Sequence, residues 1–316
     1  MNKISKKDKI AMFMDMVKKN KDIKNMPKPT QLHISTRSAK SKISSILNKS
    51  YLFEVYILIA KKIINNIVLK KNEDFLIKGI YMSKYKLETI EKKLKKIKSN
   101  VTLENIDYIL EDLKENPRGH FYNQCSFTVK PSKYKRPVSI KLFANGSMSM
   151  TGCLFEEDGL EAVKVLIKEL ENYPKLFIDD EIEIEHYSIT MINSDFKLNF
   201  KIKRYVLHDK MMSTGLLSNY DPETYPGVKI HYFWNNYNGK KNNGICVCKK
   251  KCNGKGDGSG DGECKRVTVI CFSSGSVIIT GARNETQIKD VYKKIYKHIK
   301  NCYSEIINFS ITDFLK

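Results

Sequence analysis

The sequence lacks the long hydrophobic run that a membrane-spanning helix needs. Its longest apolar stretch, residues 51–60, is too short to cross a bilayer and contains Glu54. The first ten residues, MNKISKKDKI, are polar from the start, which predicts that no secretory signal peptide is present. The eight cysteines show no pattern of a secreted disulfide framework. We therefore expect an intracellular protein in a reducing compartment.

Arginine is scarce, although the chain is strongly basic. Lys and Arg total 56 against 35 Asp and Glu, for a net charge of +21, and arginine occurs at only six positions. An A+T-rich coding genome would account for part of this lysine excess. A positive field of this size nevertheless favours an anionic partner, nucleic acid first and a membrane surface second.

The sequence also lacks a recognisable catalytic constellation. Its six histidines are scattered, and none has a Cys or paired-carboxylate spacing that predicts acid–base or nucleophilic chemistry. Hydrophobic content of 41% and charged content of 29% are typical of a globular protein. We therefore predict a binding protein and not an enzyme.

The chain contains an internal repeat. Residues 142–153, LFANGSMSMTGC, and residues 270–282, ICFSSGSVIITGA, share Phe, Gly, Ser, Thr and Gly at identical offsets from Phe143 and Phe272. Each copy has the apolar–turn–apolar pattern of a β-hairpin and is followed by a helical pattern. The sequence therefore predicts a duplicated α+β unit.

Periodicity places the other elements. We expect strands over 31–37, 121–129, 138–143, 147–151, 179–192, 220–234 and 266–281 (the second hairpin), with helices over 157–173 and 285–300. Asn284 and Gln287 form a capping-box-like start to the last helix. Residues 1–27 are predicted to be a basic tail or marginal helix. A helical insertion is predicted over about residues 48–118, and its last helix is predicted to end at Asn116-Pro117.

The repeats resemble the TATA-box-binding protein (TBP) family. The segments SNYDPETYPGV (218–228) and VICFSSGSVIITGA (269–282) resemble its second repeat, and YNQCSF (122–127) and LFANGSMSMTG (142–152) resemble its first. The pattern is most similar to the divergent TBP-like proteins of large DNA viruses. The resemblance implies two pseudo-symmetric repeats that form a curved antiparallel saddle with helices on its convex face. It divides the chain into a tail (1–27), repeat one (28–180) and repeat two (181–316, with a Cys/Gly-rich loop at 235–265).

The resemblance implies a DNA interface on the concave face. In the family, aromatic wedges enter between base steps, and TBP is a standard example of minor-groove bending. The matching positions are Phe127, Phe143, Tyr225 and Phe272. The alternative for Phe143 and Phe272 is ordinary strand core.

The groove floor departs from the family pattern. An asparagine near the start of each repeat is matched here by Leu32 and Met191, neither of which can make its hydrogen bonds. Apolar floor residues pack on A·T base edges and so select A·T pairs. This selectivity for A·T pairs would be weaker where a lysine replaces an apolar floor residue. The whole predicted floor comprises Leu32, Ile34, Lys141, Ser149, Thr151, Met191, Asn193, Ile270, Ile278 and Thr280. The predicted phosphate contacts are Lys130, Lys133, Lys135, Arg136, Lys203, Arg204, Lys265, Arg266 and Arg283.

The loop at 235–265 carries four cysteines, Cys246, Cys248, Cys252 and Cys264, within nineteen residues. Four thiolates can hold a structural Zn²⁺, although this spacing fits no standard zinc motif. The alternative is a flexible loop with reduced thiols. Ca²⁺ at Asp257 and Asp261 is disfavoured, because the oxygen ligands are too few.

Two functions follow from these patterns. The first is a TBP-like transcription factor that binds and bends A+T-rich promoter DNA, needs no cofactor, and acts as a monomer with transcription factor IIB-like and RNA polymerase partners. It would work in the nucleus, or in a viral factory or virion. The second is a saddle-fold module that mainly binds protein partners and has weak DNA affinity. The substitutions at Lys141, Leu32 and Met191 favour the second function, and the aromatic residues favour the first.

Overall fold

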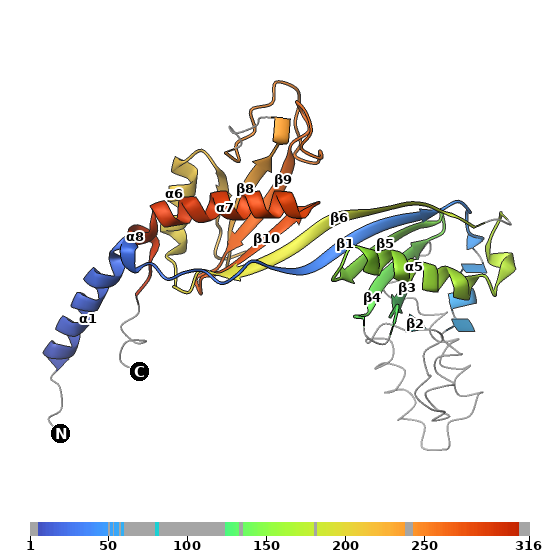
Figure 1. Ribbon diagram of the computed structural model, residues 1–316, viewed down its shortest axis with the longest axis horizontal. Helices are drawn as coiled ribbons and strands as arrows, with labels where there is room; N and C mark the ends of the chain where they lie inside the picture. The colour runs from blue at the N-terminus through green and yellow to red at the C-terminus, as the bar shows by residue number, and fades with distance from the viewer. Residues whose placement is uncertain are drawn as a thin grey trace, which may run out of the picture. The chain divides into compact units, whose positions relative to one another are not determined.

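The computed structural model describes residues 6–49, 51–52, 54–56, 58–59, 80–81, 124–132, 135–179, 182–237 and 243–309 (Figure 1). Antiparallel strand pairs form the sheet, and helices pack on them. The predicted α+β class is therefore confirmed. Most of the predicted helical insertion, at about 48–118, lies outside the described residues. In the part of the chain that the structure describes, no helix is long and apolar enough to cross a membrane.

The chain divides into two compact units, one of residues 36–190 and one of residues 1–35 and 191–316. The boundaries fall inside two long strands, β1 (His33–Ile43) and β6 (Ile184–Lys197), so each strand contributes to both units. The segment predicted as a tail contains helix α1 (Lys6–Lys21) and the short η1 (Ile23–Asn25). The Tyr303 hydroxyl donates to the Asn20 carbonyl (2.7 Å), which ties α1 to the short helix that begins at Tyr303.

The unit of residues 36–190 has the strand order β2-β3-β4-β5-β1-β6. Its strands β2 to β5 are Ile80–Tyr81, Gln124–Val129, Val138–Phe143 and Ser147–Cys153. Helix α5 (Glu157–Leu170) packs on β3, β4 and β5, and the short η2 (Pro174–Leu176) follows it (Figure 1). Ala162, Val163, Leu166 and Leu170 are buried on one stripe of α5, because apolar residues at this spacing share a helix face.

The other unit has the strand order β6-β10-β9-β8-β7. Its strands β7 to β10 are Leu217–Asn219, Val228–Trp234, Lys265–Cys271 and Ser276–Ala282. Helix α7 (Glu285–Asn301) packs on β8 and β10, and α6 (Arg204–Ser213) packs on β7 and β8. The short α8 (Tyr303–Ile306) follows α7.

The predicted hairpins are confirmed as β4–β5 and β9–β10. Each turns at a glycine with positive φ, Gly146 (+77°) or Gly275 (+85°), a conformation that other residues adopt only with strain. A Cβ on either glycine would lie within 2.5 Å of a backbone oxygen. The turn glycines shared by the two repeats are therefore required by backbone geometry.

Helix α7 begins as predicted. The Asn284 side chain accepts from the Gln287 backbone N–H (2.9 Å), and the Gln287 side chain accepts from the Arg283 N–H (2.7 Å). These bonds satisfy free donors at the helix start. Helix α6 was not predicted, because only Leu207 and Met211 are buried in it and its apolar residues form no sustained stripe.

Candidate nucleic-acid interface

Strands β8, β9 and β10 each have a buried face and a half-exposed face. Val228, Ile230, Val267, Val269 and Ile279 are fully buried, and the residues between them are half-exposed. Successive side chains on a strand point to opposite faces, so the half-exposed residues share one face of the sheet. Residues of this open face are Lys229, His231, Phe233, Thr268, Ile270, Ile278 and Thr280.

An aromatic pair lies at the edge of this open face. Tyr225 precedes β8 and Phe272 follows β9, and their ring centroids are 6.1 Å apart with an interplanar angle of 57°. Both side chains are half-exposed. The Lys229 ammonium lies 4.4 Å from the Tyr225 ring centroid, a cation–π contact that places a positive charge beside the pair. Two of the four predicted wedges are therefore adjacent, accessible and next to a cation.

Gly227 makes this packing possible. A Cβ at Gly227 would lie 2.5 Å from Ile270 Cγ2, 2.9 Å from the Tyr225 ring and 3.2 Å from the Phe272 ring. The backbone at Gly227 is not in the positive-φ region. The requirement for glycine here is therefore steric: a side chain would push the two aromatic rings and Ile270 apart.

We expect Gly227→Ala to destabilise the fold by about 1–3 kcal/mol, the usual cost of overpacking a close contact. The matched control is Gly260→Ala, because no atom lies within 4 Å of a Cβ built at Gly260. Urea unfolding measures both variants. Equal unfolding free energies for the two would contradict the steric role of Gly227.

The floor residues beside the aromatic pair are mostly apolar. Ile270 and Ile278 lie directly opposite one another on β9 and β10. Next to them, the Thr280 hydroxyl donates to the Asn193 side-chain oxygen, and Thr280 Oγ1 lies 3.5 Å from Met191 Sδ. An isoleucine pair presents no hydrogen-bonding group, so it complements the A·T minor-groove edge, which lacks the guanine amine.

The equivalent position in residues 36–190 is polar. Lys141 pairs with Ser149 across β4 and β5, at the same place as Ile270 and Ile278. Lys141 and the neighbouring Thr151 are exposed, and Ser149 is half-exposed. The face of residues 36–190 that carries Lys141, Ser149 and Thr151 can donate hydrogen bonds and attract phosphate. It offers little apolar surface to base edges.

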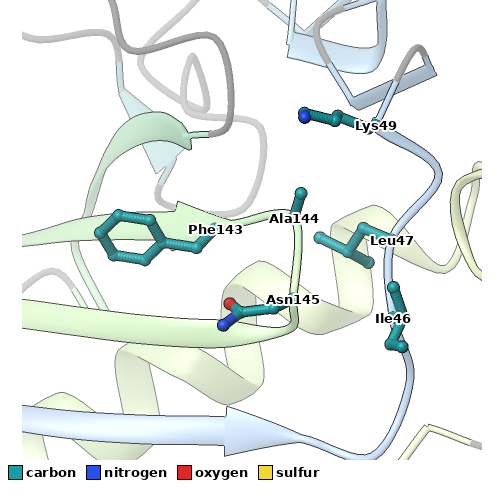
Figure 2. Close-up of a pocket in the computed structure, with 6 residues that line it drawn as sticks. All are labelled: Ile46, Leu47, Lys49, Phe143, Ala144 and Asn145. Atoms are coloured by element: carbon teal, nitrogen blue, oxygen red, sulfur yellow. The ribbon is translucent and has the colours of Figure 1, made fainter.

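Phe143 ends β4 and is half-exposed, at the equivalent place to Phe272. It lines a cavity of about 380 Å³ together with Ile46, Leu47, Lys49, Ala144 and Asn145 (Figure 2). The Leu47 N–H donates to the Ala144 carbonyl (2.9 Å), which holds residues 46–49 against the β4–β5 turn. The third predicted wedge is therefore accessible and adjoins a hollow.

The fourth predicted wedge, Phe127, is wrong. Its side chain is 3% exposed and packs edge-on against Tyr56 in the core, with ring centroids 5.5 Å apart. The strand registers explain the error: Cys125 pairs with Leu142, and Val228 pairs with Cys271, so Phe127 is equivalent to the buried Ile230. The position equivalent to Tyr225 is Tyr122, which lies outside the described residues.

The two predicted asparagine replacements, Leu32 and Met191, are not equivalent to one another. Ser38 pairs with Thr151 and Asn193 pairs with Thr280, so Met191 corresponds to Thr36. Leu32 and Ile34 are half-exposed, and Leu32 precedes the first residue of β1. Sequence matching missed this offset because β1 and β6 share few residue types.

The predicted phosphate contacts differ in their exposure and in their partners. Arg136, Lys203, Arg266 and Arg283 are exposed, and Lys130 is half-buried. Arg204 is otherwise engaged: its guanidinium donates to the Pro226 carbonyl (2.6 Å) and lies 5.3 Å from the Tyr220 ring centroid. Lys265 is half-buried, and burial together with Arg283 and Arg266 lowers its pKa. Lys133 lies outside the described residues.

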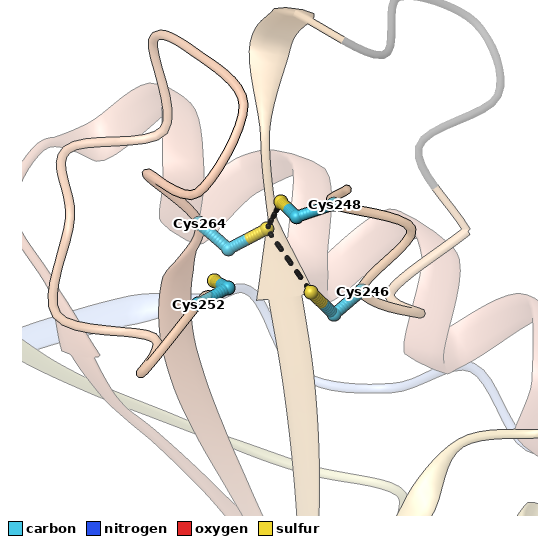
Figure 3. Close-up of side chains that lie close together, drawn as sticks. All are labelled: Cys246, Cys248, Cys252 and Cys264. Carbon is cyan, nitrogen blue, oxygen red and sulfur yellow. Dashed lines mark hydrogen bonds between the residues drawn. The ribbon is translucent and has the colours of Figure 1, made fainter. Parts of the chain in front are cut away.

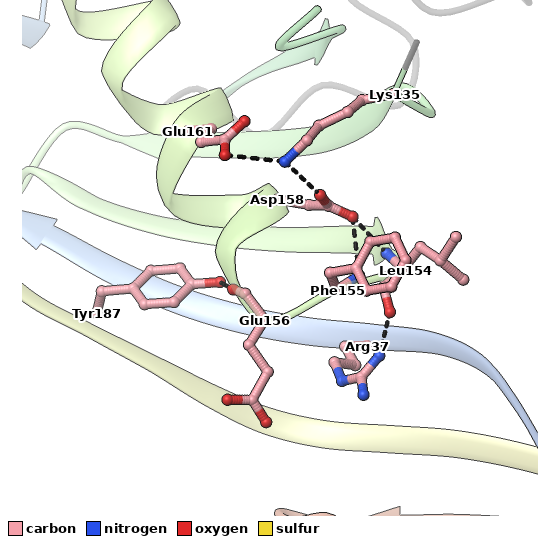
Figure 4. A network of polar contacts seen from close by, with 8 residues as sticks. All are labelled: Arg37, Lys135, Leu154, Phe155, Glu156, Asp158, Glu161 and Tyr187. Carbon is pink, nitrogen blue, oxygen red and sulfur yellow. Dashed lines mark hydrogen bonds and ion pairs between the residues drawn. The ribbon is translucent and has the colours of Figure 1, made fainter.

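Lys135 is not a phosphate contact. Its ammonium lies 3.1 Å from an Asp158 oxygen and 2.8 Å from a Glu161 oxygen, so it is held against helix α5 (Figure 4). Asp158 also accepts from the Leu154 and Phe155 N–H groups at 2.9 and 2.8 Å. Lys135 therefore has a structural role, which no pattern in the sequence around it indicates.

His231 lies within the open face and hydrogen-bonds with Thr268 (3.3 Å). Burial, with Arg266 and Lys229 nearby, lowers its pKa, so the ring is neutral near pH 7. The positive charge of this region thus comes from lysine and arginine.

The four loop cysteines come together in the structure. Their sulfur atoms all lie within 4.8 Å of one another (Figure 3). Cys264 directly precedes β9 at Lys265, whereas Phe272 follows the other end of that strand. A cluster of this composition can hold a metal ion.

Comparisons with known proteins agree with the repeat pattern. Residues 187–302 match the family model described as transcription factor TFIID (or TATA-binding protein, TBP). A TATA-box-binding protein-like protein of Acanthamoeba polyphaga mimivirus is 31% identical over 210 residues, which cover 63% of this chain and 53% of that protein. The chain thus spans about half the length of this relative. The TATA-box-binding protein of Methanocaldococcus jannaschii is 26% identical over 206 residues, 65% of this chain and 88% of that protein.

Among solved structures, Methanococcus jannaschii TBP aligns over 86% of this chain and 99% of its own, with 18% identity and a TM-score of 0.42.

Proposed function

We propose that this chain, a divergent TBP-like protein, binds A+T-rich promoter DNA through the minor groove and bends it. The observation that supports this most is the Tyr225–Phe272 pair beside the Ile270–Ile278 floor. Flat apolar side chains at a sheet edge can replace base stacking, and a wedge of this kind kinks the duplex. The adjoining floor favours A·T pairs.

The bent complex would nucleate a transcription pre-initiation complex with transcription factor IIB-like and polymerase partners, in the nucleus or at a viral site of transcription. The role requires neither catalysis nor a cofactor. A metal at the four-cysteine cluster would serve the structure of the loop, because the cluster lies at the far end of β8 and β9.

A second function is supported by the open face of residues 36–190. Lys141, Ser149 and Thr151 occupy its floor, and no isoleucine pair is found at that position. A face of this kind would bind phosphate without reading base edges, so this chain would then act mainly on protein partners with weak, non-specific DNA affinity. The first function requires that the protein bends an A+T-rich duplex, and the second does not.

The proposed function is tested with a short duplex that carries fluorescent labels at both ends. We expect the protein to shorten the end-to-end distance of an A+T-rich duplex more than that of a G+C-rich one. Affinity should fall about 10³-fold or more between 50 and 200 mM salt if six or more phosphates are contacted. Binding without a change in end-to-end distance, or no binding at physiological salt, would reject bending and leave the protein-partner function.

A further inference from the structure

The insertion between β8 and β9 brings together four cysteine sulfur atoms that are spread over nineteen residues of the sequence. Cys246 and Cys248 come from its first part, Cys252 follows after a three-residue gap, and Cys264 directly precedes β9. Cys264 is fully buried, and the other three are half-buried (Figure 3). All four are free thiols.

The spacing of these sulfurs is that of a tetrahedral metal site. Zn–S bonds of about 2.3 Å place the sulfurs of a tetrahedron roughly 3.8 Å apart. Here Cys264 Sγ lies 3.3 Å from Cys248 Sγ and 3.8 Å from Cys246 Sγ, and all four sulfurs lie within 4.8 Å of one another. Only a small adjustment separates this arrangement from metal coordination.

We propose that Cys246, Cys248, Cys252 and Cys264 bind one Zn²⁺, which fixes the insertion to the ends of β8 and β9. Each thiol would lose its proton to solvent as the metal binds. Four soft sulfur ligands in a tetrahedron suit zinc and do not suit Mg²⁺ or Ca²⁺, which prefer oxygen. The proposal stands apart from DNA binding and does not depend on it.

The surroundings of the sulfurs suit a negatively charged ZnS₄ centre. The buried Asn235 side chain donates to Cys264 Sγ (3.4 Å), and the Gly254 backbone N–H points at Cys252. Gly254 has a φ of +71°, in the left-handed region that favours glycine. Four exposed lysines lie in the same loop, Lys249, Lys250, Lys251 and Lys255. Hydrogen-bond donors and cations of this kind stabilise metal-bound thiolates.

Hydrogen bonds hold the described part of the insertion to its surroundings. Its sequence is polar and rich in glycine, and the Arg266 and Asn236 N–H groups donate to the Gly254 and Gly258 carbonyls (2.8 and 2.7 Å). The Gln287 and Arg283 side chains donate to the Asp257 and Lys255 carbonyls (3.0 and 3.1 Å). Asp257 caps a turn by accepting from the Ser259 N–H, and Asp261 accepts from the Lys249 and Lys250 N–H groups across the loop. These two carboxylates are therefore occupied within the loop and offer no Ca²⁺ site.

The test is the metal content of the full chain purified under reducing conditions. Elemental analysis and native mass spectrometry should find one zinc per chain, and Co²⁺ added to the apo-protein should give the strong visible bands of a tetrahedral thiolate site. In Cys246→Ser/Cys264→Ser the zinc ratio should fall from one to near zero. The control is Cys125→Ser. Cys125 is buried outside the cluster, and the serine hydroxyl can still donate to the Leu52 carbonyl as the thiol does. This variant should retain one zinc per chain.

The wild-type measurements do not depend on how the variants fold. A folded wild-type chain that contains no zinc and gives no thiolate bands with Co²⁺ would overturn the proposal. Zinc that remains in the double variant would also overturn it, because the metal would then lie elsewhere. Loss of zinc from Cys125→Ser while it stays folded, as judged by circular dichroism, would likewise count against the cluster.

Discussion

Replacing Tyr225 and Phe272 together by alanine is expected to abolish bending of an A+T-rich duplex. The two rings are half-exposed and 6.1 Å apart, at the edge of the face that carries the Ile270–Ile278 floor. Each aromatic–base stack contributes about 1–3 kcal/mol, and 1.4 kcal/mol is about tenfold in affinity. Each single replacement should therefore weaken binding roughly 5- to 150-fold, with end-to-end energy transfer as the measure of bending.

The control for this experiment is Phe155→Ala. Phe155 is also an exposed aromatic residue, 58% accessible, but it lies between β5 and α5 and is not part of a strand. It should leave both bending and affinity unchanged. Phe272→Leu should keep part of the bending, because leucine also serves as an apolar wedge. Bending that survives in the double variant, or is lost equally in Phe155→Ala, would rule out this pair as the wedge.

Asp158→Asn is expected to reduce the free energy of unfolding by about 3 kcal/mol at pH 7, as for other broken buried ion pairs. The carboxylate is 4% exposed, faces Lys135, and accepts two backbone hydrogen bonds at the start of α5 (Figure 4). Asparagine keeps the shape but loses the charge, and it leaves the Lys135 ammonium with one carboxylate partner. Urea unfolding followed by circular dichroism measures the loss.

The pH dependence gives a second signature. Burial acts to raise the pKa of Asp158, but the Phe155 N–H, Lys135 and the Leu154 N–H outweigh it, and the pKa lies below its usual value. This group therefore stabilises the fold above its unfolded pKa of about 3.9, and the contribution is lost as the pH falls through the lower folded value. The difference between wild type and Asp158→Asn should shrink in acid.

Glu161→Gln is the matched control for Asp158→Asn. Glu161 pairs with the same Lys135 ammonium, but its side chain is 45% exposed, so the pair is screened by water. A loss of under about 1 kcal/mol is expected. Similar losses in the two variants would show that burial does not decide the strength of this network.

The repeat, the hairpins and most element bounds followed from the sequence by itself. Alternating apolar residues, turn glycines at Gly146 and Gly275, and the Asn284–Gln287 cap are local signals, and each acts within a few residues. The resemblance to the TBP family, and not local periodicity, singled out Phe143, Tyr225 and Phe272, and the structure places each of them at or near a strand end. Net charge and residue types likewise indicated an anionic partner.

Only the tertiary structure decided which of the predicted wedge aromatics are accessible and which are buried in the core. Phe127 is buried because the register of β3 against β4 sets its face, and a shift of one residue reverses every side chain. The pairing of Lys135 with Asp158 depends on how a loop residue packs against helix α5. Such contacts carry no signal in local sequence, because they are fixed by how the strands and helices pack together.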